Sequence, residues 1–273
     1  MGDGGDELAG RRVLVVGASA GIGRATALRC AERGADVVFS GRRQDKLDEA
    51  VTTAGRGHAI AADVTDPDQC RTLVSRAAEL LDGIDLVVFA AAVSRILRLR
   101  EATADDWDAI LRTNVIGPAL VLQAALPHLR PGAVVALLSS ESVGAPFPGL
   151  VPYGTSKAAL EELIRGFRVE HPEVRFCRVT IGSTEGTEFA RDFDLDVAAE
   201  LFPRWVALGR LPDRLMLADE VGRVLADSLA VALATPGVDC QDLVLRAPGA
   251  EATGDADDFV AMVEGLSALQ QDS

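Results

Sequence analysis

The stretch Val13-Leu14-Val15-Val16-Gly17-Ala18-Ser19-Ala20-Gly21-Ile22-Gly23 predicts how this chain begins to fold. Its four consecutive apolar residues are typical of a parallel strand that is buried on both faces. The glycines after them let the backbone approach a bound group closely, and a helical pattern follows to about Arg33. The start of a helix offers free N–H groups and the positive end of the helix dipole. A strand, a glycine-rich turn and a helix in this order therefore predict a site for the pyrophosphate of a dinucleotide, although the spacing Gly-x-x-x-Gly-x-Gly is looser than Gly-x-Gly-x-x-Gly.

The end of the second expected strand indicates which dinucleotide is bound. Residues 36–40 form that strand, and it continues into Gly41-Arg42-Arg43. In a dinucleotide-binding domain this end lies beside the adenosine ribose, where a carboxylate binds the 2′-hydroxyl of NAD and an arginine accommodates the 2′-phosphate of NADP. Two guanidinium groups without a carboxylate favour NADP(H) as the cofactor. The alternative is that both arginines are solvated loop charges.

Strand and helix patterns alternate along the rest of the chain. Further strands are expected at residues 59–62, 85–89, 133–138, 174–181 and 241–245. Helices are expected at 44–53, from the turn at 63–67 to about 81, at 103–127, from Tyr153 onward and at 218–233. This alternation with short connections predicts an α/β protein with a Rossmann-type, doubly wound parallel β-sheet and helices on both faces.

The chain divides into one domain and two short ends. Residues 1–10 are expected to be a disordered acidic lead, residues 11–250 the Rossmann-fold domain, and residues 251–273 a helical tail. The tail repeats apolar residues at helical spacing, namely Phe259, Met262, Val263, Leu266 and Leu269. Residues 183–217 are the least regular part, and their apolar residues fit either a mobile flap over a cleft or a surface helix pair.

Composition excludes several classes of function. The net charge is −14, and no basic stripe is interleaved with aromatic residues, which argues against nucleic acid and anionic membranes as partners. The four cysteines stand far apart, so we interpret them as reduced packing residues, and neither they nor the three histidines form a metal-ligand motif. The acidic N-terminus has no apolar core of a secretory signal, so a cytoplasmic location is expected.

A second motif carries the chemistry. Tyr153 is the one tyrosine of the chain, and Lys157 stands four positions later, so both side chains share one face of a helix. An ammonium group beside a phenol stabilises the phenolate and is expected to lower the tyrosine pKa from its reference value of about 10 towards neutrality. Such a tyrosine exchanges a proton with an oxygen atom near neutral pH. The alternative is a half-buried tyrosine beside a lysine whose ammonium reaches solvent.

Together these features resemble the short-chain dehydrogenase/reductase family in its single-domain form. The resemblance extends from Val13 to about Leu245 and follows the family's order of motifs. These are the glycine motif at 17–23, Asp63 after the third strand, Asn114, Ser140 and the Tyr153–Lys157 pair, with Ser140 standing 13 residues before Tyr153.

The resemblance implies a role for each of these residues. Tyr153 would be the general acid and base, Lys157 would lower its pKa and hold the nicotinamide ribose, and Ser140 would bind the substrate oxygen. Asn114 would hold a water molecule that links Lys157 to solvent. The residues implied to bind the cofactor NADP(H) are Gly17, Ser19, Ala20, Gly21, Ile22, Gly23, Arg42, Arg43, Asp63, Val64, Ala90, Tyr153, Lys157, Ile181 and Thr184.

The chain departs from the family pattern at two strand ends. Where the family usually has Asn-Asn-Ala-Gly, this chain has Phe89-Ala90-Ala91-Ala92, so the hydrogen bonds of two side-chain amides must be replaced. The usual Pro-Gly after the sixth strand is Ile181-Gly182, and either Thr184 or Thr187 would contact the nicotinamide amide. Ser142 is a second candidate for the serine role, although its spacing to Tyr153 is shorter by two residues.

Two functions from different classes fit these observations. The first is an NADP(H)-dependent oxidoreductase that interconverts a carbonyl and a secondary alcohol. The second is a non-catalytic NADP(H)-binding sensor or scaffold, suggested by the altered end of the fourth strand. The family resemblance also implies a homodimer or a homotetramer and a small-molecule substrate, whose lining residues are expected at 93–100, 142–152 and 183–210. An isomerising or dehydrating relative usually has a larger C-terminal substrate domain than this chain contains.

Overall fold

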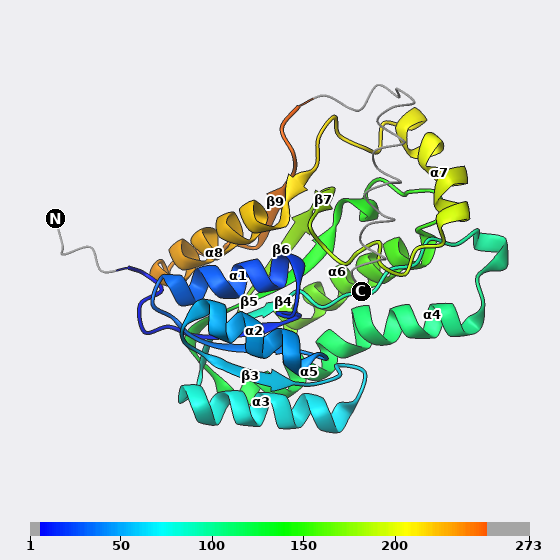
Figure 1. The fold of residues 1–273 in the computed structure, drawn as a ribbon. Coiled ribbons are helices and arrows are strands. Elements are labelled where there is room, and N and C mark those ends of the chain that lie inside the picture. The colour runs from blue at the N-terminus through cyan, green and yellow to red at the C-terminus, as the bar shows by residue number, and fades with distance from the viewer. Residues whose placement is uncertain (1–5, 250–273) are drawn as a thin grey trace.

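The computed structural model describes residues 6–249 and shows an α/β domain built on one large parallel sheet (Figure 1). The expected helical tail lies outside the described residues. The strands are β1 (Arg12–Val16), β2 (Asp36–Gly41), β3 (His58–Ala61), β4 (Ile84–Phe89), β5 (Leu129–Ser140), β6 (Arg175–Ile181), β7 (Thr184–Glu185), β8 (Met216–Leu217) and β9 (Asp242–Leu245). The helices are α1 (Gly21–Glu32), α2 (Gln44–Ala54), α3 (Pro67–Leu81), α4 (Ala104–Leu111), α5 (Gly117–Ala125), α6 (Val151–Glu170), α7 (Leu195–Ala207) and α8 (Ala218–Ala234).

The large sheet has seven strands in the order β3-β2-β1-β4-β5-β6-β9, and every neighbouring pair is parallel. The chain moves outward from β1 to β3 and then returns to place β4 on the other side of β1. The first connections on either side of this point diverge, which opens a crevice at the carboxyl ends of β1 and β4. The predicted Rossmann-type, doubly wound sheet is confirmed.

Helices cover both faces of the sheet, because its strands carry apolar residues on both sides. α1 and α8 lie side by side on one face, and α3 and α5 lie on the other (Figure 1). On the first face Val13, Val15 and the small residues of α1 pack against α8, while on the second Leu14 and Val16 pack against α3 and α6. This two-sided burial is the reason that the strands appear in the sequence as continuous apolar runs.

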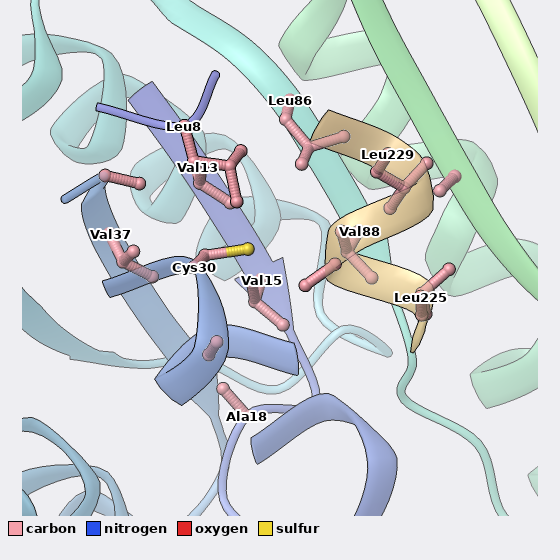
Figure 2. Close-up of a cluster of buried hydrophobic side chains, with 14 of the residues drawn as sticks. Leu8, Val13, Val15, Ala18, Cys30, Val37, Leu86, Val88, Leu225 and Leu229 are labelled. Carbon is pink, nitrogen blue, oxygen red and sulfur yellow. The ribbon is translucent and has the colours of Figure 1, made fainter. Parts of the chain in front are cut away.

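The start of the chain is attached to the domain, which corrects the expectation of a disordered lead as far as residues 6–10 are concerned. Leu8 is fully buried beside Val13 in the core under α8 (Figure 2). Asp6 and Glu7 both form ion pairs with Arg33 at the end of α1, at 3.0 and 2.8 Å. The expectation of disorder rested on the acidic composition of residues 1–10 and did not take account of Leu8, which anchors this segment in the core.

The long helix expected at 103–127 is present but changes its winding in the middle. Thr103 caps α4 through a capping box with Asp106, and the turn Arg112–Ile116, between α4 and α5, is a π-helix that contains Asn114. The helical run Ala104–His128 is long and apolar enough to cross a membrane. This is weak evidence for a membrane span, because the core helix of a soluble protein passes the same test. In this domain Val121 and Leu122 of the run are buried in the core against α3.

Residues 183–217 form one helix, α7, and a short pair of parallel strands instead of the helix pair that was one of two alternatives. The two strands, β7 and β8, pair Thr184 with Met216, so the two ends of the segment are held together. Between them, Phe193, Phe202 and Trp205 are buried in an apolar cluster of their own. This cluster also contains Tyr153, so the segment packs directly on the expected catalytic residue.

The anchoring role of Leu8 gives a stability prediction. Replacing Leu8 with Ala removes a fully buried side chain and leaves a cavity, and we expect the free energy of unfolding to fall by about 2–5 kcal/mol. Urea denaturation followed by circular dichroism measures this. The control is Leu99→Ala, because Leu99 is 54% exposed and its loss is expected to change little. Equal stability of Leu8→Ala and wild type would contradict the packing described here.

Candidate active site

A cavity of about 610 Å³ lies at the carboxyl ends of the central strands. Its walls are the glycine-rich turn after β1, the ends of β2 to β6, the start of α6 and the segment that leads into α7. All of the residues predicted to bind the cofactor line this one cavity, together with Ser140. These residues are far apart in sequence but close in space, because the carboxyl ends of parallel strands lie at the same edge of the sheet.

The glycine-rich turn has a shape that needs its glycines. Gly17 has φ +94° and Gly21 has φ +55°, both in the left-handed region that favours glycine. A Cβ on Gly17 would stand 2.5 Å from the backbone nitrogen of Ala91, and one on Gly23 would collide with the carbonyl oxygen of Gly17. The first residues of α1 have no side-chain cap, since Ala20 occupies that position, so their N–H groups face the cavity without a side-chain partner.

The altered end of β4 is held by its backbone. The amides of Ala90 and Ala91 both donate to the carbonyl of Val16, at 2.8 and 3.1 Å. The Ala90 methyl group lies close to Gly23, where a Cβ would be 3.0 Å away from it. Two main-chain hydrogen bonds thus attach this strand end to the end of β1, next to the glycine-rich turn, without any side-chain amide.

The part of the cavity at the ends of β2 and β3, where the sequence predicts the adenosine of a dinucleotide, contains Arg42, Arg43, Asp63 and Val64. Arg42 is exposed, and within residues 6–249 its side chain has no hydrogen bond or ion pair. Arg43 donates from Nη2 to Ser19 Oγ at 3.1 Å. The Asp63 carboxylate accepts hydrogen bonds from the amide and the hydroxyl of Thr65, which fixes the turn after β3.

Ser140, Tyr153 and Lys157 meet at the opposite end of the cavity. Ser140 ends β5, and its side chain lies near enough to Tyr153, on the first turn of α6, to lower the pKa of the phenol. The Lys157 Nζ donates to the carbonyl of Leu138 at 2.7 Å and lies 5.7 Å from the centroid of the Tyr153 ring. The spacing of four residues therefore places the phenol and the ammonium on one face of α6, as predicted.

Asn114 lies behind this group, and it does not line the cavity. Its amide nitrogen donates to the carbonyl of Val93 and to Ser156 Oγ, at 2.9 and 3.0 Å, and its oxygen accepts from the Val93 amide. Ser156 in turn donates to the carbonyl of Tyr153 at 2.7 Å. The π-helical turn directs Asn114 to this position, and π-turns often occur at functional sites. In this structure Asn114 supports the backbone of the first turn of α6.

The electrostatics of the pair differ from the expectation. Burial raises the pKa of Tyr153 to about 12; the hydrogen bond with Ser140 opposes this change, and the nearby charge of Glu141 adds to it. Burial also lowers the pKa of Lys157 to about 8. The expectation that Lys157 moves the tyrosine pKa towards neutrality is therefore wrong for this structure, because the removal of the phenol from water is the dominant effect on its pKa.

A buried polar network supports the end of β5. Ser139 Oγ donates to Glu161 at 2.6 Å, and Arg178 on β6 donates to the other oxygen of that carboxylate at 2.7 Å. Arg178 also pairs with Asp242 on the edge strand β9 at 2.7 Å. Glu161 lies one helical turn after Lys157, so this network fixes α6 and the strand that carries Ser140 relative to each other.

Several residues of the cavity wall were missed in the sequence. Glu141 follows Ser140 directly and accepts a hydrogen bond from Ser183 at 2.9 Å. Glu188 lies in the expected lining segment 183–210, but its ion pair with Arg43 was not expected, because no short-range pattern connects these two residues. The expected substrate-lining segments contribute Ser94, Ser142, Phe147, Leu150, Phe189, Phe193, Phe202 and Trp205 to the wall. The hydroxyls of Ser94 and Ser142 are buried and have no partner within the described residues.

The end of β6 leaves one earlier alternative open. Ile181, Thr184 and Thr187 all line the cavity. The Thr184 hydroxyl donates to the carbonyl of Gly182 at 2.9 Å, while the Thr187 hydroxyl accepts from the amide of Phe189 at 3.4 Å. Both hydroxyls are engaged by the local backbone, so the structure does not favour one of them.

The single tyrosine makes the pKa prediction directly measurable. Alkaline titration of the tyrosine absorbance near 295 nm is expected to give a midpoint above 10 and close to 12, because burial disfavours the phenolate. A raised folded-state pKa also means that this group's contribution to stability is lost as the pH rises from about 10 to 12, so circular dichroism must confirm folding at each point. Tyr153→Phe is the control without signal. A midpoint below 9 in the folded chain would contradict the prediction.

Comparison with known proteins agrees with this geometry. The family model for short chain dehydrogenase matches residues 11–197. The chain is 38% identical to "Dehydrogenase/reductase SDR family member 4" of Pongo abelii over 172 residues, which cover 60% of this chain and 62% of that protein. It is 32% identical to a glucose 1-dehydrogenase of Gluconobacter oxydans (strain 621H) over 174 residues, covering 61% and 65%.

A solved structure extends the likeness over most of the chain. A short chain dehydrogenase from Burkholderia cenocepacia J2315 in complex with NADP is 30% identical, with a TM-score of 0.76, and the match covers 90% of this chain and 100% of that one. The alignments to the two curated relatives above span less than two thirds of their lengths. On the family match and the shared architecture, the chain belongs to the short chain dehydrogenase family.

Proposed function

We propose that this protein is an NADP(H)-dependent oxidoreductase that interconverts a carbonyl and a secondary alcohol. The observation that carries the proposal is the meeting of Ser140, Tyr153 and Lys157 in the same cavity as a glycine-rich turn suited to phosphate. Proton donors for a substrate oxygen and a binding site for a dinucleotide are the two parts that such a reaction needs.

The residues of the cavity fit a dinucleotide. Gly17 and Gly23 leave space that a Cβ would fill, and the uncapped start of α1 offers N–H groups to a pyrophosphate. Arg42 and Arg43 stand at the adenosine end of the same cavity, where two guanidinium groups suit a 2′-phosphate. The Asp63 carboxylate already accepts two hydrogen bonds from Thr65, which closes the turn after β3.

The proton would be moved by Tyr153. When bound, the nicotinamide would supply or accept the hydride. Because burial raises the pKa of Tyr153 to about 12, its phenol is protonated at neutral pH and is ready to donate to a carbonyl oxygen. In the direction of alcohol oxidation, the phenol oxygen of Tyr153 must first lose its proton before it can accept one from the alcohol. The protonation state of Tyr153 in the free protein therefore favours carbonyl reduction.

Ser140 and Lys157 would assist this transfer in different ways. Ser140 lines the cavity beside Tyr153, so its hydroxyl would donate to the same substrate oxygen as the phenol. Lys157 is 3% exposed, and its pKa of about 8 keeps it mostly charged at pH 7. A buried ammonium close to the phenol would stabilise negative charge as the proton leaves.

The substrate part of the cavity is mainly apolar, which favours a carbonyl compound with a hydrophobic body. Phe147 and Trp205 pack edge to face with ring centroids 5.1 Å apart, and Phe189 packs in the same way against Tyr153 at 5.1 Å. The related glucose 1-dehydrogenase has a polar substrate by its name, whereas this aromatic wall supports an apolar one.

The likeness to the Burkholderia structure supports the cofactor. That protein was solved in complex with NADP, and the two chains share their architecture over most of their lengths. We therefore propose NADP(H) in preference to NAD(H), on the combined grounds of this likeness and the two arginines at the end of β2.

The role of Tyr153 gives the next prediction. Tyr153→Phe keeps the ring but removes the transferable proton, so we expect turnover with NADPH and an apolar ketone panel to fall by about 10²–10⁴ while the dissociation constant of NADPH changes little. Steady-state kinetics and fluorescence titration measure the two quantities. Unchanged turnover in Tyr153→Phe would contradict the assignment, and absence of turnover in wild type across the panel would favour the sensor or scaffold alternative.

A further inference from the structure

Arg43, one of the two arginines proposed to bind the 2′-phosphate, is already held by a carboxylate. Its Nη1 lies 2.6 Å from Glu188 Oε1, and its Nη2 donates to Glu188 Oε2 at 2.8 Å. Two contacts of this kind form a bidentate ion pair, which is the geometry that a guanidinium also uses for phosphate. The same Nη2 donates to Ser19 Oγ on the glycine-rich turn.

The segment that carries Glu188 lies against both ends of the site. Next to it, Thr187 packs on the glycine-rich turn, where a Cβ on Gly21 would be 3.3 Å from the Thr187 Cα. On its other side, Phe189 packs on Tyr153. Residues 187–189 therefore contact Arg43, the glycine-rich turn and Tyr153.

Glu188 has a second partner to which it can turn. Arg191, three residues further along the chain in the turn before α7, donates to Glu188 Oε2 at 3.3 Å. Displacement from Arg43 would thus leave the Glu188 carboxylate paired with another guanidinium and also partly solvated, since its side chain is 39% exposed.

We propose that Glu188 is a specificity-determining residue for the cofactor, acting as a carboxylate that the 2′-phosphate of NADP(H) must displace from Arg43. This inference rests on the proposed function, because it requires a cofactor with a 2′-phosphate. NAD(H) brings no group to this position and leaves the Arg43–Glu188 pair in place. Glu188 therefore lowers the affinity for NADP(H) selectively and couples the position of residues 187–189 to the 2′-phosphate.

Removing the carboxylate charge is expected to tighten the binding of the phosphorylated cofactor. The side chains of Arg43 and Glu188 are 33% and 39% exposed, so solvent weakens their attraction. A half-exposed ion pair and the repulsion between a carboxylate and a phosphate together predict that Glu188→Gln lowers the dissociation constant of NADPH by about 3- to 10-fold. The effect should shrink at high salt, because exposed charges are screened.

The experiment measures the dissociation constants of NADPH and NADH by fluorescence titration of the full chain at low and high salt. The variants are Glu188→Gln and Arg42→Ala. The matched control is Glu200→Gln, since Glu200 on α7 also pairs with an arginine, Arg98, but lies outside the cavity wall. We expect tighter NADPH binding and unchanged NADH binding in Glu188→Gln, and no change in Glu200→Gln.

The other outcomes separate this inference from the proposed function. If Arg42→Ala weakens NADPH selectively but Glu188→Gln leaves both affinities unchanged, the cofactor assignment stands and the role of Glu188 is overturned. If Glu188→Gln changes NADPH and NADH affinity equally, Glu188 acts on the segment and not on the 2′-phosphate, which also overturns it. If wild type shows no preference for NADPH and Arg42→Ala affects both cofactors equally, the proposed cofactor fails, and this inference fails with it.

Discussion

The end of the cavity that contains Tyr153 depends on an ammonium group that has been removed from water. Lys157 is held by one hydrogen bond to the carbonyl of Leu138, which joins the second turn of α6 to the end of β5. Burying a charge is costly, and the lowered lysine pKa expresses that cost. The helix can stay there because the Ser139–Glu161–Arg178 network fixes it to two strands. Under the proposed function, this positive charge would lie where a phenolate of Tyr153 has to be stabilised.

Sequence reasoning succeeded where the local structure depends on the spacing of residues. The strand, turn and helix at residues 13–33 and the four-residue step from Tyr153 to Lys157 are set by backbone geometry alone. It failed where the outcome depends on the folded surroundings. The direction of the Tyr153 pKa shift is set by its burial, in an apolar cluster to which residues 183–217 contribute. The position of Leu8 is set by a core that α8 completes from a distant part of the chain.

The proposed cofactor site carries local positive charge on a protein that is acidic overall. A chain with a net charge of −14 must attract a cofactor that is itself anionic under the proposed function. It would do so locally, through the uncapped start of α1 and two adjacent guanidinium groups that would contact the cofactor directly. Salt screens the more distant acidic surface, so its repulsion of the cofactor is weakened more than these short-range attractions. Glu188 places an acidic group inside this small basic region, so the selectivity of the site would reflect a balance between a few charges and not the net charge of the protein.

The central claim is that this cavity binds NADP(H) in an orientation that serves Tyr153. The most direct measurement is a fluorescence titration of the purified wild-type chain with NADPH and, separately, with NADH, because it requires no knowledge of the substrate. The account predicts saturable binding of NADPH that is at least about tenfold tighter than that of NADH, as expected for a 2′-phosphate held by charge-assisted hydrogen bonds. Binding of neither cofactor, or tighter binding of NADH, would contradict it.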